Sequence, residues 1–255
     1  MGVVNITPDS FSDGGRFFRV DDAVTQARRL ADEGADIIDL GGESTRPGAA
    51  PVSEDEELRR VLPVLQKLPS MCVSVDTRRP RVMRAALEAG ASMINDVDAL
   101  GAPGALEAVA GSGCAVCLMH KKGEPATMQR DPHYDDVVIE VRQFLAARAA
   151  AATAAGIAEE RIVVDPGFGF GKTAEHNLTL LKHLAELSEL PVLVGLSRKS
   201  TLGRITGRSV DERLAGSLAM ALLALQRGAT ILRVHDVKET RDVIAVWQAY
   251  KEDSN

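Results

Sequence analysis

The sequence predicts an α/β fold: a closed (β/α)8 TIM barrel formed by a single domain over residues 1–255. Eight short apolar runs of strand length alternate with stretches of helical periodicity along the whole chain. An even division gives units of about 32 residues, close to the ~30 of a βα repeat, and the total is close to the ~250 of a complete barrel. Polar residues follow every run, whereas an open doubly wound sheet, the structural alternative, would gather its ligand groups at one switch point.

The apolar runs are the expected strands. They lie at residues 2–6, 36–40, 72–75, 92–94, 115–119, 161–164, 192–194 and 230–234. Near-continuous apolar runs are typical of parallel strands that are buried on both faces.

Helical spacing replaces these runs between the strands. Apolar residues from Leu58 to Leu68 form one stripe, which Ser53 and Glu56 open as a capping box. Two further stripes are expected to be helical: Val137, Val138, Val141, Phe144 and Leu145, and then Leu178, Leu181, Leu184 and Leu187. The Ala-rich stretch at 145–158 is interpreted as part of one long helix that ends at Gly156.

Glycines mark where several helices end. Gly34, Gly90 and Gly228 each precede an alanine just before an expected strand. A helix that stops there needs a left-handed residue at its C-terminal cap, and glycine adopts that conformation without strain. The repeated pattern supports one βα unit used many times.

Composition limits the classes of function. The chain has 30 basic and 36 acidic residues, a net charge of −6, and its basic residues are dispersed, which argues against a nucleic-acid surface. No apolar stretch approaches the ~18 residues of a membrane span, and the N-terminus lacks a secretion signal. Three cysteines, an odd number with two in apolar runs, indicate a reducing compartment. We therefore expect a cytoplasmic protein without nucleic-acid or membrane partners.

Polar residues at the strand ends are the candidates for function, because barrels of this type carry their chemistry there. These residues are Asn5, Asp39, Asp76, Asn95, Asp96, His120, Asp165, Ser197, Arg198, Lys199, Arg233 and His235. Any one of them could be a turn or helix-cap residue. Their convergence at one rim predicts a site.

The rim is expected to divide into two chemistries. Arg198, Lys199, Arg233 and His235 follow strands seven and eight, where barrels often bind phosphate, and residues 200–205 could form the short extra helix. Asp76, Asn95, Asp96 and Asp165 gather on the other side. Carboxylates and an amide can pair with the amidine-like edge of an N-heterocycle and stabilise positive charge on its ring.

Other patterns are weaker signals. Residues 167–173 resemble a phosphate loop, but Pro166 replaces the first glycine of a Walker A motif, and Lys172 replaces the last glycine of a dinucleotide fingerprint. The segment is therefore interpreted as a loop whose glycines let backbone approach the ligand. His120 and His133 lack zinc spacing, whereas a hard metal held by substrate phosphates and one protein oxygen, such as that of Asn5, fits better. The loops at 7–18 and 41–53 are expected to act as lids.

Several motifs resemble the dihydropteroate synthase family. The two long signatures are NITPDSFSDGG at 5–15 and DLGGESTRPG at 39–48. Shorter ones are SVDT at 74–77, NDV at 95–97, DPGFGF at 165–170, SRKS at 197–200 and RVHD at 233–236. They occur in order and span nearly the whole chain, which makes the resemblance specific.

The resemblance implies a Mg²⁺-dependent transferase of folate biosynthesis and a sulfonamide target. It joins 4-aminobenzoate to (7,8-dihydropterin-6-yl)methyl diphosphate and releases pyrophosphate. Carried over by motif, the pterin-binding residues are Asp76, Asn95, Asp165 and Lys199; the diphosphate-binding residues are Asn5, which also binds the metal, Arg233 and His235. The residues around 4-aminobenzoate are Phe11, Thr45, Arg46, Pro47, Phe170, Arg198 and Ser200. Asp39 supports the site, and the implied catalytic residues are Asp76, Lys199, Arg233 and His235.

The resemblance also implies a homodimer. The expected helix at 214–225 is apolar on nearly every face, as a helix buried on both sides would be. Two alternatives stay open: a methyltetrahydrofolate-corrinoid methyltransferase, whose substrate has no diphosphate, and a non-catalytic pterin-binding protein. Family members usually have further residues before the first strand, so the bottom of the barrel is expected to be less well covered. Asp98, Lys121 and Lys122 depart from the family and receive no role.

Overall fold

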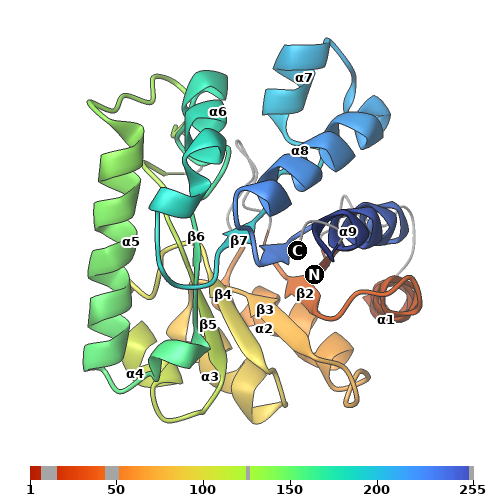
Figure 1. Cartoon of the computed structure of the whole chain (residues 1–255). Helices are drawn as coiled ribbons and strands as arrows, with labels where there is room; N and C mark the ends of the chain where they lie inside the picture. Colours follow the sequence, from red (N-terminus) through yellow and green to blue (C-terminus); the bar gives the residue numbers. More distant parts are fainter. Residues whose placement is uncertain (7–15, 44–51, 125–126, 253–255) are drawn as a thin grey trace.

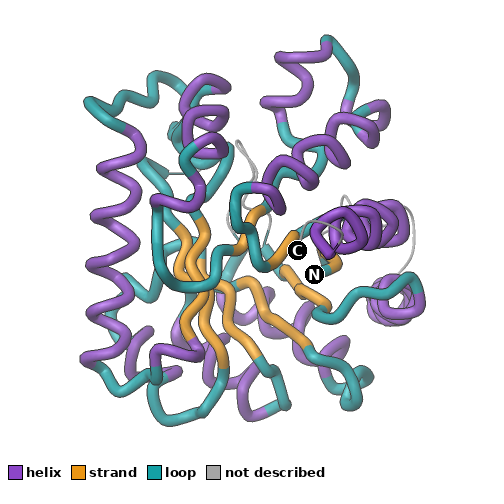
Figure 2. Tube along the Cα trace, viewed as in Figure 1, coloured by secondary structure: helices purple, strands orange, loops and turns teal. Residues whose placement is uncertain are grey.

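The computed structural model describes residues 1–6, 16–43, 52–124 and 127–252. Figure 1 and Figure 2 show strands at the centre of the molecule and helices around them. The described strands are β1 (Gly2–Asn5), β2 (Ile38–Gly41), β3 (Val73–Asp76), β4 (Met93–Asp96), β5 (Ala115–Met119), β6 (Ile162–Asp165), β7 (Leu193–Val194) and β8 (Ile231–Leu232). The α-helices are α1 (Arg16–Asp32), α2 (Glu54–Leu65), α3 (Pro80–Glu88), α4 (Ala105–Val109), α5 (Val137–Ala154), α6 (Ala174–Lys182), α7 (Ser200–Thr206), α8 (Leu214–Gln226) and α9 (Val237–Glu252).

The strands form a closed parallel ring, as the sequence predicts. β1 to β6 pair in chain order, and β7 pairs with β8. Single bridges join the two sheets, between Val164 and Val192 on one side and between Gly2 and Val234 on the other. The (β/α)8 barrel is therefore confirmed, and its closure brings β8 beside β1.

Two layers of apolar side chains fill the protein. The inner cluster, inside the barrel, comprises Met1, Met93, Cys117, Val163 and Leu193. A larger cluster runs from Val4 to Val237, between the strands and the helices. Cys114 and Cys117 have the spacing of a CxxC pair, which the sequence interpretation overlooked, but they belong to different clusters and both are free thiols.

Most expected helix boundaries are found. Gly34, Gly90 and Gly228 have φ of 98°, 99° and 91°, and Gly156, with φ of 95°, follows the end of α5. Ser53 caps α2 by accepting a hydrogen bond from the Glu56 N–H at 3.2 Å. The extra helix after β7 is present as α7.

Two boundaries differ from expectation. The stripe from Leu178 to Leu187 is not one helix: α6 ends at Lys182, His183 has non-helical φ and ψ of −107° and 23°, and a 3-10 turn follows at Leu184–Glu186. Residues 16–18 of the first expected lid already belong to α1, and Gly41 of the second belongs to β2. The other lid residues lie largely outside the described part of the chain. The single domain over 1–255 stays a prediction.

No helix in the described ranges is long and apolar enough to cross a membrane.

At the N-terminal ends of the strands, a cavity of about 470 Å³ lies among residues that include Met1, Ile37, Leu232 and Trp247.

Candidate active site

Arg233 joins the strand ends on one side of the barrel mouth. Its Nε donates to Asp39 Oδ2 at 2.6 Å, and its Nη2 donates to Asp76 Oδ2 at 3.1 Å. Asn95 Nδ2 donates to the same oxygen of Asp39 at 3.3 Å. Asp39 is fully buried. β8 therefore supplies the cation for carboxylates on β2 and β3.

This placement adds a contact that the predicted division of the rim does not include. The prediction places Arg233 among the anion-binding groups, and the structure pairs it with Asp76 of the acidic half and with the supporting residue Asp39. In a closed ring β8 is next to β1, so its side chain can reach across to β2 and β3. Carboxylates held this close in a buried site need a cation between them.

Burial and mutual charge set the protonation of this cluster. Burial raises the pKa of Asp76 to about 7, with a further rise from Asp39 and a partial reduction by Arg233. Burial lowers the pKa of Arg233, but Asp39 and Asp76 outweigh it and leave that pKa above its usual value. Burial also raises the pKa of Asp165, against the Lys199 ammonium and the Gly167 N–H.

Lys199 connects the loop after β7 to the loop after β6. Its Nζ donates to the carbonyl oxygen of Phe168 and lies 4.7 Å from the centre of the Phe170 ring. Burial lowers the pKa of Lys199 to about 8, and Asp165 counteracts this effect. Three residues assigned to the site by motif, Asp165, Phe170 and Lys199, are therefore brought together.

Arg198 and His235 are held by neighbouring loops. Arg198 has a left-handed φ of 57°, and its Nε donates to Asp236 Oδ2 at 3.0 Å. His235 Nδ1 lies 3.0 Å from Ser197 Oγ. Ser200, the first residue of α7, is exposed. All five of these residues lie after β7 or β8, where the sequence predicts an anion site.

Asp96 does not join the acidic cluster, contrary to the prediction. Its two carboxylate oxygens accept hydrogen bonds from the Asp98 N–H at 2.7 Å and the Leu100 N–H at 2.8 Å. Leu100 and Ala99 have positive φ, and Arg148 binds both of their carbonyl oxygens at 2.8 Å. The side chain of Asp96 therefore stabilises a left-handed turn after β4.

Lys172 is a buried cation that the sequence interpretation missed. It is 2% exposed, and its Nζ donates to Gly167 O at 3.0 Å and Phe170 O at 3.1 Å and lies 2.8 Å from His120 Nδ1. Burial lowers its pKa to about 7. Burial and then Lys172 lower the pKa of His120 to about 3, so His120 is a neutral acceptor.

The glycines of this loop approach protein backbone. Gly167 and Gly171 have φ of 68° and 65°, and a Cβ on either would stand 1.8 Å from His120 O or 2.1 Å from Lys122 O. The sequence predicted that they admit a ligand; here they let the loop after β6 pack on the loop after β5. The only sequence signal for Lys172 was its place directly after this glycine series.

The remaining assignments are partly described. Asn5 ends β1 and pairs with Gly41 of β2. Phe11, Thr45, Arg46 and Pro47 lie outside the described residues. Within the described ranges, no group of three or more His, Cys, Asp and Glu could hold a metal ion, and His133 is exposed beside Asp135.

Asp76 should make stability depend on pH. Its folded pKa lies above its unfolded value, so the native state holds an extra proton between about pH 4 and pH 7, and the free energy of unfolding falls as pH rises through that range. We expect Asp76→Asn to reduce this fall by roughly 1–3 kcal/mol, measured by urea unfolding at about pH 5 and pH 8. Asp36→Asn, at an exposed carboxylate, is the control. An unchanged fall in Asp76→Asn would contradict the raised pKa.

Lys172→Met should disturb the loop that carries Phe170. Two buried carbonyl oxygens lose their donor, so we expect a loss of about 2–4 kcal/mol in the free energy of unfolding and a pterin affinity lower by on the order of tenfold. Urea unfolding and calorimetry measure the two effects. Lys182→Met, at an exposed position in the last turn of α6, should change neither. Normal pterin affinity in folded Lys172→Met would show that the loop keeps its position without the ammonium.

Comparison with known proteins agrees with this geometry. The family model described as "Pterin binding enzyme" matches residues 1–235. The dihydropteroate synthase of Escherichia coli strain K12 is 52% identical over 254 residues, covering 98% of this chain and 90% of the relative.

Two solved structures are similar over nearly their whole length. Xanthomonas albilineans dihydropteroate synthase with 4-aminobenzoic acid is 56% identical, with a TM-score of 0.93 and coverage of 98% of this chain and 92% of that one. Yersinia pestis dihydropteroate synthase in a sulfonamide drug complex is 48% identical, with a TM-score of 0.93 and coverage of 99% and 94%.

Identity at this level over nearly full length favours the synthase over a corrinoid-dependent methyltransferase or a non-catalytic pterin binder. The barrel mouth holds carboxylate, amide and ammonium groups, of which Asp39, Asn95 and Asp165 are buried. The chain belongs to the pterin-binding enzyme family, as one of the dihydropteroate synthases.

Proposed function

We propose that the chain condenses 4-aminobenzoate with (7,8-dihydropterin-6-yl)methyl diphosphate and binds the pterin at Asp76, Asn95, Asp165 and Lys199. The observation that supports this most is the polar cluster at the ends of four strands. It brings together two carboxyl groups, an amide and an ammonium group, of which Asn95 and Asp165 are buried and Asp76 and Lys199 are partly exposed. These groups can accept from and donate to the edge of an amidine-like heterocycle.

The diphosphate is proposed to lie over Arg233 and His235. Arg233 uses Nε and Nη2 on Asp39 and Asp76, and a guanidinium has five N–H donors, so an anion can be bound while both carboxylates stay paired. Ser197 Oγ lies 3.0 Å from His235 Nδ1, a contact that orients the imidazole ring. We therefore propose that Arg233 serves both halves of the rim.

Mg²⁺ is the proposed metal. No group of three or more His, Cys, Asp and Glu among the described residues could hold a metal ion, and Mg²⁺ commonly takes substrate phosphates and water as most of its ligands. The amide oxygen of Asn5, at the end of β1, would be the protein ligand. When bound, the metal supplies positive charge that neutralises the departing pyrophosphate.

The protein's own groups favour departure of pyrophosphate before attack by the amine. An arylamine is a weak nucleophile, so loss of the leaving group is the demanding step. Arg233 and His235 stabilise negative charge on the diphosphate, and Asp76, with Asp39 behind it, stabilises positive charge that develops on the pterin. The second substrate then needs a pocket at Thr45, Arg46, Pro47, Phe11, Phe170, Arg198 and Ser200.

Binding should therefore be ordered. We expect 4-aminobenzoate to bind the free enzyme weakly and to bind clearly once pterin, pyrophosphate and Mg²⁺ are present. In the proposed order the pterin binds first, and the pocket for 4-aminobenzoate is completed only afterwards. Isothermal calorimetry with and without these ligands measures the difference. Equal affinity in both states would favour a preformed pocket and direct displacement.

A homodimer is proposed over α7 and α8. Met220, Ala221 and Ala224 pack inward from α8, so the helix is buried on one side only within a single chain. Ile205, Val210, Leu214 and Leu223 are exposed by 52%, 49%, 36% and 46%. A second copy of the chain would cover these side chains.

Light scattering at micromolar concentration tests the dimer. We expect twice the mass of the chain, and Leu223→Glu should shift the protein toward a monomer because it places a charge in the proposed interface. Val246→Glu, at an exposed apolar residue of α9, is the matched control. A monomer mass for the unmodified chain would refute the interface.

Location and other partners also stay proposals. The three cysteines are free thiols, which suits a reducing cytoplasm. No nucleic-acid or membrane partner is proposed.

A further inference from the structure

Glu43 and Val52 are the residues on either side of segment 44–51, and they contact each other directly. Glu43 Oε1 accepts a hydrogen bond from the Val52 N–H at 3.2 Å. The two residues that flank the segment are therefore bound to each other.

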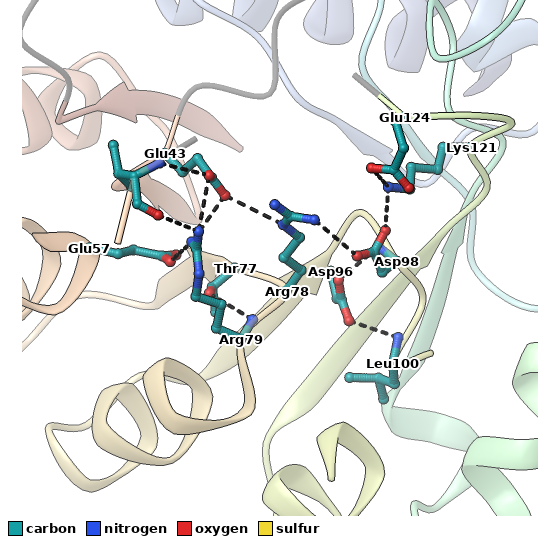
Figure 3. A network of polar contacts seen from close by, with 11 residues as sticks. Glu43, Glu57, Thr77, Arg78, Arg79, Asp96, Asp98, Leu100, Lys121 and Glu124 are labelled. Atoms are coloured by element: carbon teal, nitrogen blue, oxygen red, sulfur yellow. Dashed lines mark hydrogen bonds and ion pairs between the residues drawn. The ribbon is translucent and has the colours of Figure 1, made fainter. Parts of the chain in front are cut away.

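Arg79 binds both flanking residues through one guanidinium (Figure 3). Its Nη1 donates to Glu43 Oε2 at 3.0 Å, and its Nη2 donates to Glu43 Oε1 at 3.1 Å. The same Nη2 donates to the carbonyl oxygen of Val52 at 2.6 Å. A planar fork that meets a carboxylate with two bonds fixes orientation as well as distance.

Elements on either side hold the three residues in place. The Arg79 N–H donates to Thr77 Oγ1 at 3.2 Å, and α3 begins at the next residue. Arg79 also pairs with Glu57 of α2, which is fully buried. Gly42 presses on α2 so closely that a Cβ would lie 2.8 Å from Val61 Cγ2, and this contact sets where Glu43 emerges from β2.

The same network extends to the next two loops of the rim (Figure 3). Arg78 lies 3.5 Å from Glu43 Oε2 and 3.9 Å from Asp98 Oδ2, and Lys121 Nζ lies 2.7 Å from Asp98 Oδ1. Asp98 and Lys121, which had no role in the sequence, thus connect the loops after β4 and β5 to Glu43. Acidic and basic side chains alternate along this network, so each carboxylate has a cation beside it.

We propose that Arg79 is a positioning residue for 4-aminobenzoate, acting by holding Glu43 and Val52 at the base of the segment that bears Thr45, Arg46 and Pro47. This rests on the proposed role of those three residues. Arg79 touches no substrate. Because it follows Asp76 by only three residues, it fixes the base of this segment relative to the strand that carries the pterin carboxylate.

Arg79→Lys is the informative variant. Lysine keeps the positive charge beside Glu43 and Glu57, but a single ammonium cannot reproduce the fork to Glu43 and the bond to Val52. We expect KM for 4-aminobenzoate to rise on the order of tenfold, while pterin affinity and KM for the pterin diphosphate stay unchanged. A purely structural defect would move the parameters of both substrates together.

Arg81→Lys is the matched control. Arg81 lies two residues further along, is 58% exposed in its side chain and pairs with Glu54 and Asp55 at the surface. Arg81→Lys makes the same chemical change two residues away, in the first turn of α3, without touching Glu43 or Val52, so both KM values should stay at those of the unmodified enzyme. If Arg79→Lys does not fold, Glu43→Gln, which retains one acceptor oxygen but loses the ion pair, takes its place with the same expected result.

Two outcomes overturn the proposal: an unchanged KM for 4-aminobenzoate in the folded variant, or a parallel rise for both substrates. A further variant, Arg46→Ala, tests the proposed role of Arg46 in binding 4-aminobenzoate separately from the positioning role of Arg79. If Arg46→Ala raises KM for 4-aminobenzoate and Arg79→Lys does not, only the positioning role fails. If Arg79→Lys raises it and Arg46→Ala does not, the positioning role stands, and the assignment of Arg46 fails.

Discussion

The ion pair between the buried Asp39 and the partly exposed Arg233 is the interaction on which the rest of the site depends. The two residues are 194 positions apart and meet because the barrel closes between β8 and β1. Leaving either partner of such a pair buried without the other costs about 3–5 kcal/mol. Asn95 donates to the same Asp39 oxygen, and Asp76 depends on the same guanidinium. The same ion pair therefore links closure of the barrel, charge balance at its mouth and the position of the Asp76 carboxylate.

Three charged side chains hold the loops around this pair in position. Each binds backbone groups of a loop or the residues next to it. Asp96 holds the turn after β4 through two N–H groups, and Lys172 holds the loop after β6 through two carbonyls. Arg79 holds the flanks of the loop after β2. Each is largely or wholly shielded from solvent, so its bonds act at low dielectric and are costly to break. These contacts therefore fix the positions of the loops that carry residues proposed to bind substrate.

The sequence determined the fold and the membership of the site to a large extent. Alternating apolar runs gave the eight strands because parallel strands are buried on both faces, and glycines at 34, 90 and 228 gave the helix ends because only a left-handed residue fits there. Strand ends at the same rim follow from that topology, so Asp39, Asp76, Asn95, Asp165, Lys199 and Arg233 could be named as candidates from order alone. The family motifs added the implied substrates, the reaction and a role for each residue.

Tertiary structure alone decided which charges pair. The sequence placed Arg233 with the anion-binding residues and Asp96 with the heterocycle-binding ones, yet Arg233 neutralises two carboxylates and Asp96 caps a left-handed turn. It placed Lys172 only as the residue that breaks a dinucleotide fingerprint, and nothing in the pattern predicted His120 as its neutral acceptor. Periodicity reports which face of an element is apolar. The partner of a buried charge depends on distances between loops far apart in the chain, which exist only once the ring has closed.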